Sequence, residues 1–66
     1  MENMKRRTNH INKFREAKGW RQLDLARKLD MYQSEVSAIE REEREPGVHI
    51  AKRIAKVLGK KTDEIF

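Results

Sequence analysis

The sequence has no cysteine among its 66 residues and only two histidines, His10 and His49. The lack of cysteine excludes a disulfide framework, cysteine-based zinc sites and thiol chemistry. Two histidines alone do not provide the spaced ligand cluster of a structural metal site. We therefore expect a protein that needs no metal and no cofactor.

Long hydrophobic runs are also missing. No apolar stretch approaches the roughly 18 residues of a membrane-spanning helix, and no hydrophobic signal-peptide segment follows the basic start of the chain. These absences predict a soluble, cytoplasmic protein without membrane contact. With 36% hydrophobic and 41% charged residues, the chain is expected to form one small domain whose stability comes from regular helix packing.

Recognisable catalytic groupings are absent as well. The sequence shows no serine–histidine–aspartate or cysteine–histidine set and no glycine-rich phosphate loop. Its carboxylates are scattered along the chain, as solubility alone requires. We therefore do not expect an enzyme.

Positive charge is what the sequence has in excess. Sixteen lysines and arginines against eleven aspartates and glutamates give a formal net charge of +5. In so small a domain this balance favours a polyanionic partner, with nucleic acid as the leading candidate. A solvated surface without such a partner is the alternative, because small helical proteins are generally rich in charge.

The chain divides at residue 9. Residues 1–8 carry the basic cluster Lys5, Arg6 and Arg7 without apolar periodicity. We interpret them as a flexible basic arm, either a DNA contact or a solvated tail. From residue 9 onward apolar residues recur with a helical period and no strand-like alternation, which predicts one all-α domain over residues 9–66. Its five short helices are expected at 9–18, at 21–29, at 33–41, between Gly47 and Gly59, and at 62–66.

The first of these helices is expected to have Thr8 or Asn9 as its N-cap. Its inward face is predicted to consist of Ile11, Phe14 and Ala17, which follow one another at intervals of three.

The second and third predicted helices are joined by a connector of only three residues, 30–32. Two short helices with so short a connector, and with small Ala26 at their crossing, indicate a helix-turn-helix. Met31 is expected to fill the corner of the turn.

The third predicted helix has two chemically different faces. Val36 and Ile39 are apolar and face inward. The outward residues are Gln33, Ser34, Ser37 and Ala38. Glutamine pairs with adenine, serine bonds most base edges, and an alanine methyl group contacts a thymine methyl. We therefore expect this face to read bases in the major groove.

These segments resemble the Cro/lambda-repressor type of helix-turn-helix regulators. The resemblance runs without a gap from about Ile11 to Phe66. It is carried by Pro46 and by the segments 18–22 (KGWRQ), 25–29 (LARKL), 36–41 (VSAIER), 54–59 (IAKVLG) and 63–66 (DEIF). It implies a compact five-helix domain that binds a palindromic double-stranded DNA operator as a homodimer, in the cytoplasm and associated with the nucleoid. Repression of transcription by occlusion is the simplest outcome, and activation through contact with the polymerase is the alternative.

The resemblance also implies roles for single residues. Gln33, Ser34 and Ala38 match the base-contacting positions of the family, with Ser37 as a nearby candidate. Trp20 stands where the family has a bulky apolar side chain, which implies that it lies in the core. Gln22 matches a glutamine that bonds a phosphate and supports the first residue of the recognition helix, here Gln33.

Five charged residues have expected roles around this helix. Arg15 and Glu40 match a structural ion pair between the first and third helices. Arg41 and Arg44 are expected to position the DNA backbone, and Arg21 to reach a phosphate.

Three positions depart from the family pattern at helix boundaries. Arg21 and Tyr32 stand where the family usually has a capping threonine or serine, and the loss of each cap costs about 0.5–2 kcal/mol. Asp30 replaces the usual glycine of the turn, which is tolerable because aspartate adopts the left-handed conformation more readily than most residues.

The acidic segment 40–45 is a further departure, because the family is more basic there. Its acids are expected to weaken phosphate binding. This segment keeps a second interpretation open, in which the same fold is an antitoxin-like or coactivator-like module that binds another protein. Leu23, with Ile65 and Phe66, is a candidate for a dimer or partner surface.

Overall fold

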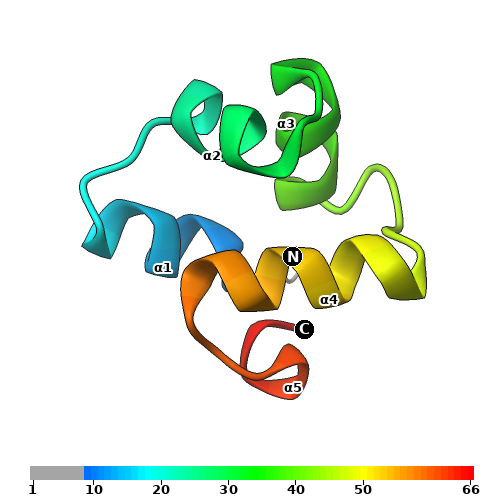
Figure 1. Cartoon of the computed structure of the whole chain (residues 1–66). Helices are drawn as coiled ribbons and strands as arrows, with labels where there is room; N and C mark the ends of the chain where they lie inside the picture. Colours follow the sequence, from blue (N-terminus) through cyan, green and yellow to red (C-terminus); the bar gives the residue numbers. More distant parts are fainter. Residues whose placement is uncertain (1–8) are drawn as a thin grey trace, which may run out of the picture.

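The computed structural model describes residues 9–66, so the predicted arm of residues 1–8 lies outside the described residues. Its helices are α1 (Ile11–Ala17), α2 (Gln22–Leu29), α3 (Gln33–Glu40), α4 (Val48–Leu58) and α5 (Thr62–Ile65) (Figure 1). The prediction of an all-α domain with five short helices is confirmed, and residues 9–66 contain no strand. The first helix is shorter than predicted at both ends.

The helices form two levels around a common core. Figure 1 shows α2 and α3 as one pair, with α1 and the longer α4 below them and α5 folded back beneath α4. The pairs α2–α3 and α4–α5 make the most extensive contacts. This arrangement leaves one side of α3 free to face solvent.

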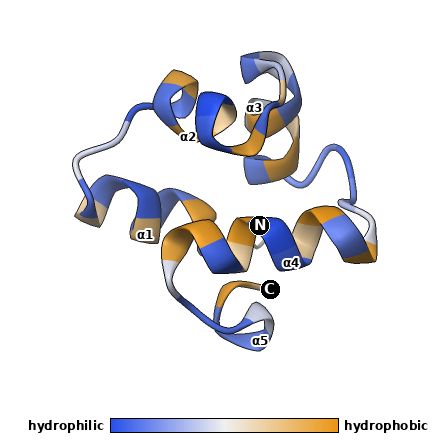
Figure 2. Ribbon diagram, in the orientation of Figure 1, coloured by the Kyte–Doolittle hydropathy of each residue, from blue (hydrophilic) through white to orange (hydrophobic). Residues whose placement is uncertain are grey.

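Every helix contributes to the core. Figure 2 shows apolar stripes on the helices, strongest on α4. The buried apolar residues are Ile11, Leu25, Ala26, Leu29, Val36, Ile39, Ile54, Ala55, Leu58 and Ile65. Phe14, Trp20 and Met31 pack against them while remaining partly exposed. Trp20 is therefore at the edge of the core rather than within it.

One inward position was predicted wrongly. Ala17 is exposed, whereas Arg15 is buried. The reason is the helical period of about 3.6 residues, which places the sixth residue after Ile11 about 120° away from it and the fourth only about 40° away. Position 15 therefore faces inward, although arginine is polar.

Acidic residues at the third helical position replace the missing threonine or serine caps. The backbone N–H of Arg21 donates to the Asp24 carboxylate at 2.8 Å, and the N–H of Tyr32 donates to Glu35 at 3.1 Å. No capping bond is made by the Arg21 or Tyr32 side chain. Half of a capping box thus remains at each helix, which offsets part of the expected loss.

The start of α1 also differs from the prediction, because His10 is its N-cap residue. Asn9 still helps to close this end, since its Oδ1 accepts from the Ile11 N–H at 3.2 Å. Its amide donates to the Ile39 carbonyl at 2.8 Å, and the His10 N–H donates to the Ile65 carbonyl at 2.9 Å. These bonds attach the chain before α1 to the ends of α3 and α5.

The turn between α2 and α3 depends on a left-handed aspartate. Asp30 has a φ of 58°, and the N–H of Met31 donates to the Ala26 carbonyl at 2.9 Å, as in a Schellman motif. The guanidinium of Arg53, on α4, donates to the carbonyl of Leu29 at the same helix end. The turn is therefore held from both α2 and α4.

Candidate nucleic-acid interface

The solvent face of α3 carries the residues predicted to read bases. Val36 and Ile39 are buried, whereas Gln33 and Ser34 are exposed. Ser37 and Ala38 are half-buried. Because the opposite side of the helix packs in the core, this face is presented on a rigid support.

A buried ion pair holds the end of α3. Arg15 and Glu40, expected as a structural pair, lie 2.7 Å apart from Nε to Oε2, with side chains only 8% and 5% exposed. A second bond, from Nη2 to Oε1, measures 3.3 Å. The remaining Nη1 of Arg15 donates to the Trp20 carbonyl at 2.7 Å. The guanidinium thus joins α1, the chain before α2, and α3.

Gln22 completes this network. Its side-chain amide donates to Glu40 Oε1 at 3.1 Å. A buried carboxylate needs partners for its remaining lone pairs, and Gln22 provides one. The bond fixes the first turn of α2 to the last turn of α3, while the phosphate contact and the support of Gln33 stay predictions.

The arginines predicted to contact phosphates all lie beside carboxylates. Arg21 Nε is 3.3 Å from Asp24 Oδ2, and Arg44 Nη1 is 3.8 Å from Glu35 Oε2. Arg41 is held most closely, since its Nε and Nη2 each donate to Glu43 at 2.9 Å. The surface formed by these three ion pairs is called the arginine face below.

Arg41 also connects the arginine face to a base-reading candidate. Its Nη1 donates to the hydroxyl of Ser37. The hydrogen bond with Glu43, and then its charge, raises the pKa of Arg41 above the ordinary value. The same bond lowers the pKa of the Glu43 carboxyl. Both groups therefore remain charged at neutral pH, in a pair exposed to solvent.

The chain reverses at the end of α3 to bring Glu43 to Arg41. Glu42 adopts a left-handed φ of 59°. The N–H of Glu42 donates to the Ile39 carbonyl at 3.1 Å, and that of Glu43 to the Ala38 carbonyl at 2.9 Å. These are the two bonds of a Schellman motif, with glutamate where glycine is preferred.

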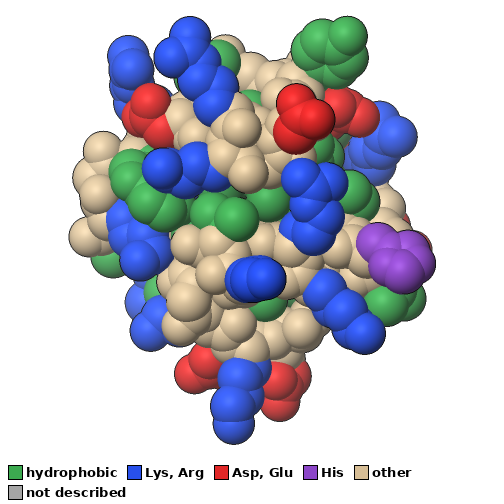
Figure 3. All heavy atoms as spheres, viewed as in Figure 1, with side chains coloured by type: hydrophobic (Ala, Val, Ile, Leu, Met, Phe, Trp, Pro, Cys, Tyr) green, Lys and Arg blue, Asp and Glu red, His purple; other side chains and the backbone are tan. Residues whose placement is uncertain are grey.

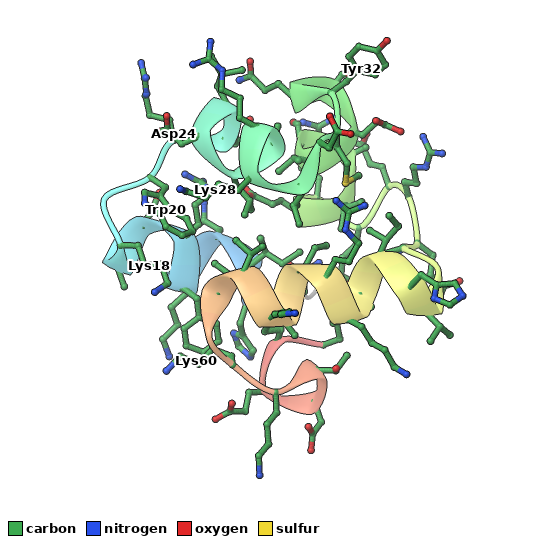
Figure 4. All side chains as sticks on the ribbon, in the orientation of Figure 1. Lys18, Trp20, Asp24, Lys28, Tyr32 and Lys60 are labelled. Carbon is green, nitrogen blue, oxygen red and sulfur yellow. The ribbon has the colours of Figure 1, made fainter. Side chains whose placement is uncertain are left out.

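Lysines surround two aromatic rings on another part of the surface. The ammonium of Lys28 lies 4.7 Å from the centre of the Trp20 ring, and that of Lys18 lies 5.4 Å from it. Lys60 is 4.9 Å from the centre of the Phe14 ring. Figure 4 shows Lys18 and Lys28 beside Trp20, with Lys60 below them. We call these five residues the lysine–aromatic surface.

The apolar surface residues differ from those expected. Ile65 is fully buried and Leu23 is half-buried, so they do not form a surface patch with Phe66. The reason for Ile65 is that α5 folds back and inserts it beneath α4. Val48 and Phe66 are instead exposed, at 69% and 46%, and line one groove between the start of α4 and the end of α5.

Residues 9–66 contain neither a membrane-spanning helix nor a metal-binding cluster. No helix there is long and apolar enough to span a bilayer. The same residues contain no group of three or more histidines and acids placed to hold a metal ion.

Comparison with known proteins gives two findings. The helix-turn-helix family matches residues 11–65. Among solved structures, a hypothetical transcription factor from Neisseria, NHTF, superposes with a TM-score of 0.78 at 31% sequence identity. The match covers 83% of this chain but only 63% of the Neisseria chain. No curated protein sequence matches the chain.

Proposed function

Because the chain belongs to the helix-turn-helix family, of the Cro/lambda-repressor type, we propose that it regulates transcription by binding specific sequences of double-stranded DNA through α3. The observation that carries the proposal is the solvent face of α3. It presents short polar side chains on a helix whose end is fixed by the buried network of Arg15, Glu40 and Gln22.

Base recognition is assigned to the start and middle of α3. Gln33 and Ser34 are exposed beside the turn, and a helix-turn-helix places the N-terminal residues of its recognition helix against base edges. Gln33 has the donor and acceptor needed for adenine, and the Ala38 methyl suits a thymine. Ser37 lies on the same side of the helix.

Phosphate contacts are assigned to Gln22 and Arg21 at the start of α2 and to Arg41 and Arg44 directly after α3. Such contacts fix the register of a protein on the duplex without reading sequence. Lys5, Arg6 and Arg7 are proposed to add contacts from the chain before residue 9.

We further propose that the protein is a homodimer on a palindromic operator and that it represses transcription by occlusion. Two recognition helices about 34 Å apart then enter successive major grooves.

Selection of bound sequences from a random duplex library tests the proposed function. We expect a palindromic motif whose affinity falls steeply with salt. Gln33→Ala should lower affinity for the motif by about 1–3 kcal/mol and relax sequence preference, whereas Arg44→Ala should weaken binding to all sequences alike. If no motif is enriched, sequence-specific regulation is refuted and the protein-binding module becomes the better interpretation.

A further inference from the structure

Each arginine of the arginine face already has a carboxylate partner in the free protein. Arg21 lies beside Asp24, Arg41 beside Glu43, and Arg44 beside Glu35. All three arginines are those assigned to DNA phosphates. An arginine bonded to a carboxylate must release it, at least in part, before the same N–H groups can bind a phosphate.

The pair of Arg41 and Glu43 has the geometry for such an exchange. Nε and Nη2 of Arg41 form two parallel bonds of 2.9 Å to the two oxygens of Glu43. A phosphate group accepts the same fork of donors, because guanidinium binds carboxylate and phosphate in the same bidentate way. The Glu43 carboxylate therefore occupies the place that a phosphate oxygen pair would take.

The exchange is readily reversible because the pair is exposed. The side chains of Arg41 and Glu43 are 55% and 61% accessible to solvent. Ion pairs at such positions are weak, and their loss changes an equilibrium constant by at most about fivefold. A DNA backbone can displace Glu43, but its affinity is lowered by the competition.

We infer that Glu43 is an internal competitor of DNA phosphate: its carboxylate holds Arg41 in the free protein and is exchanged for a backbone phosphate when DNA binds. The inference rests on the proposed function. It gives the acidic segment after α3 a defined role, in which it limits binding to any duplex and so leaves base contacts to decide which sequence is occupied.

Glu43 is the carboxylate on which the exchange can be tested cleanly. Asp24 and Glu35 also accept the backbone N–H groups at the starts of α2 and α3, so replacing them alters the helix caps. The bonds that the Glu43 carboxylate makes within residues 9–66 all come from Arg41. Glu45, in the same loop, is exposed and forms no ion pair in this part of the chain, which makes it a matched control.

The experiment compares Glu43→Gln with Glu45→Gln, each of which removes one negative charge. Affinities are measured for the selected motif and for a random duplex at several salt concentrations. Glu43→Gln should raise both affinities by the same factor, up to about fivefold, and steepen the slope of log affinity against log salt by up to about 0.9. Glu45→Gln should have a clearly smaller effect.

A third variant identifies the arginine. In the Arg41→Ala background Glu43→Gln should lose its specific effect and match Glu45→Gln, since no guanidinium remains to be released. Equal effects of the two glutamine variants in the native background would overturn the inference. So would a full Glu43→Gln effect without Arg41.

The two proposals fail in different ways. If the library yields no motif but Glu43→Gln still tightens binding to random duplex through Arg41, sequence-specific regulation fails and the exchange stands. If a motif is found and Glu43→Gln behaves as Glu45→Gln does, the regulator stands and the exchange fails. Thermal unfolding of all variants verifies that affinity, and not folding, has changed.

Discussion

The arginine face and the lysine–aromatic surface use positive charge in two different ways. Within residues 9–66 every ion pair involves an arginine. On the arginine face, each of the three arginines lies beside its own carboxylate. On the other surface Lys18, Lys28 and Lys60 lie over aromatic rings. Figure 3 shows the carboxylates gathered near α2 and α3 and near α5, with lysines and arginines between them.

The difference follows from the chemistry of the two side chains. Arginine has a planar fork of donors that fits a carboxylate or a phosphate, whereas lysine has a compact charge on a flexible apolar stem. The stem of a lysine covers a ring while its ammonium stays in water. The arginine face is therefore arranged for directed exchange of anions, and the lysine–aromatic surface protects the edge of the core.

Arg15 and Glu40 form a buried ion pair, whereas the pairs of the arginine face are exposed to solvent. Glu40→Gln tests how much this burial matters for stability. The change leaves the buried Arg15 guanidinium without its counter-charge, and we expect a loss of about 3–5 kcal/mol in the free energy of unfolding. Glu16→Gln is the control, because Glu16 lies 3.9 Å from the same arginine but is 65% exposed. Urea denaturation should show almost no change for the control. Similar losses in both variants would contradict the role given to burial.

The left-handed turn that carries Glu43 to Arg41 is tested by Glu42→Gly. A residue with a side chain at this φ of 59° is strained, so glycine should raise the free energy of unfolding by up to about 1 kcal/mol. Glu45→Gly, at a position without positive φ, should lower it slightly, because glycine gains backbone entropy on unfolding. Thermal unfolding distinguishes the two. Equal destabilisation by both changes would show that residue 42 is not strained.

The sequence predicted the helices and the turn because these depend on local patterns. Apolar periodicity and the short connector gave all five helices, and Asp30 was expected in the left-handed conformation that it adopts. Ala17 was placed inward because it follows Ile11 by two steps of three residues. Two such steps fall short of two helical turns by about 120°, so Ala17 lies off the inward face. Leu23 and Ile65 could not be assigned correctly, because their burial depends on which neighbouring helix covers them.

The sequence predicted which residues make up the candidate site, but not which side chains they bond. The apolar pattern identified the outward residues of α3, and family spacing identified the pair Arg15–Glu40. The partners of Gln22 and Arg41 were not predictable, because each depends on distances between side chains brought together in the fold. In this chain the acid two residues after Arg41 reaches it across Glu42, whose left-handed φ of 59° reverses the backbone.

The lysine–aromatic surface is tested by Lys28→Gln. Removing the ammonium 4.7 Å from the Trp20 ring should lower the free energy of unfolding by about 0.5–1 kcal/mol, the value of an exposed cation–π contact. Lys56→Gln, an exposed change on α4, is the matched control and should be close to neutral. Tryptophan fluorescence should shift only in the Lys28 variant. If Lys28→Gln lost no more stability than the control, the contact of Lys28 with the Trp20 ring would not stabilise the fold.

The smallest expected effect is a pH dependence of stability, which the arginine face should show and the lysine–aromatic surface should not. The hydrogen bond from the Arg21 backbone N–H, followed by that from the Arg21 side chain, lowers the pKa of Asp24 below its ordinary value. Because the folded pKa is below the unfolded one, the stabilisation is complete above the unfolded value of about 4 and is lost as pH falls through the folded pKa.

Lysine ammonium groups stay charged throughout that acid range, so acid weakens the helix cap and ion pair at Asp24 without removing the cation–π contacts. Asp24→Asn keeps an acceptor for the Arg21 N–H but cannot titrate. Unfolding free energies of the native protein and this variant should therefore differ by a constant amount near neutral pH and converge below about pH 4. Parallel curves down to the acid limit would mean that the charge of Asp24 contributes nothing to the arginine face. Convergence would show that this carboxylate stabilises the start of α2 as an anion.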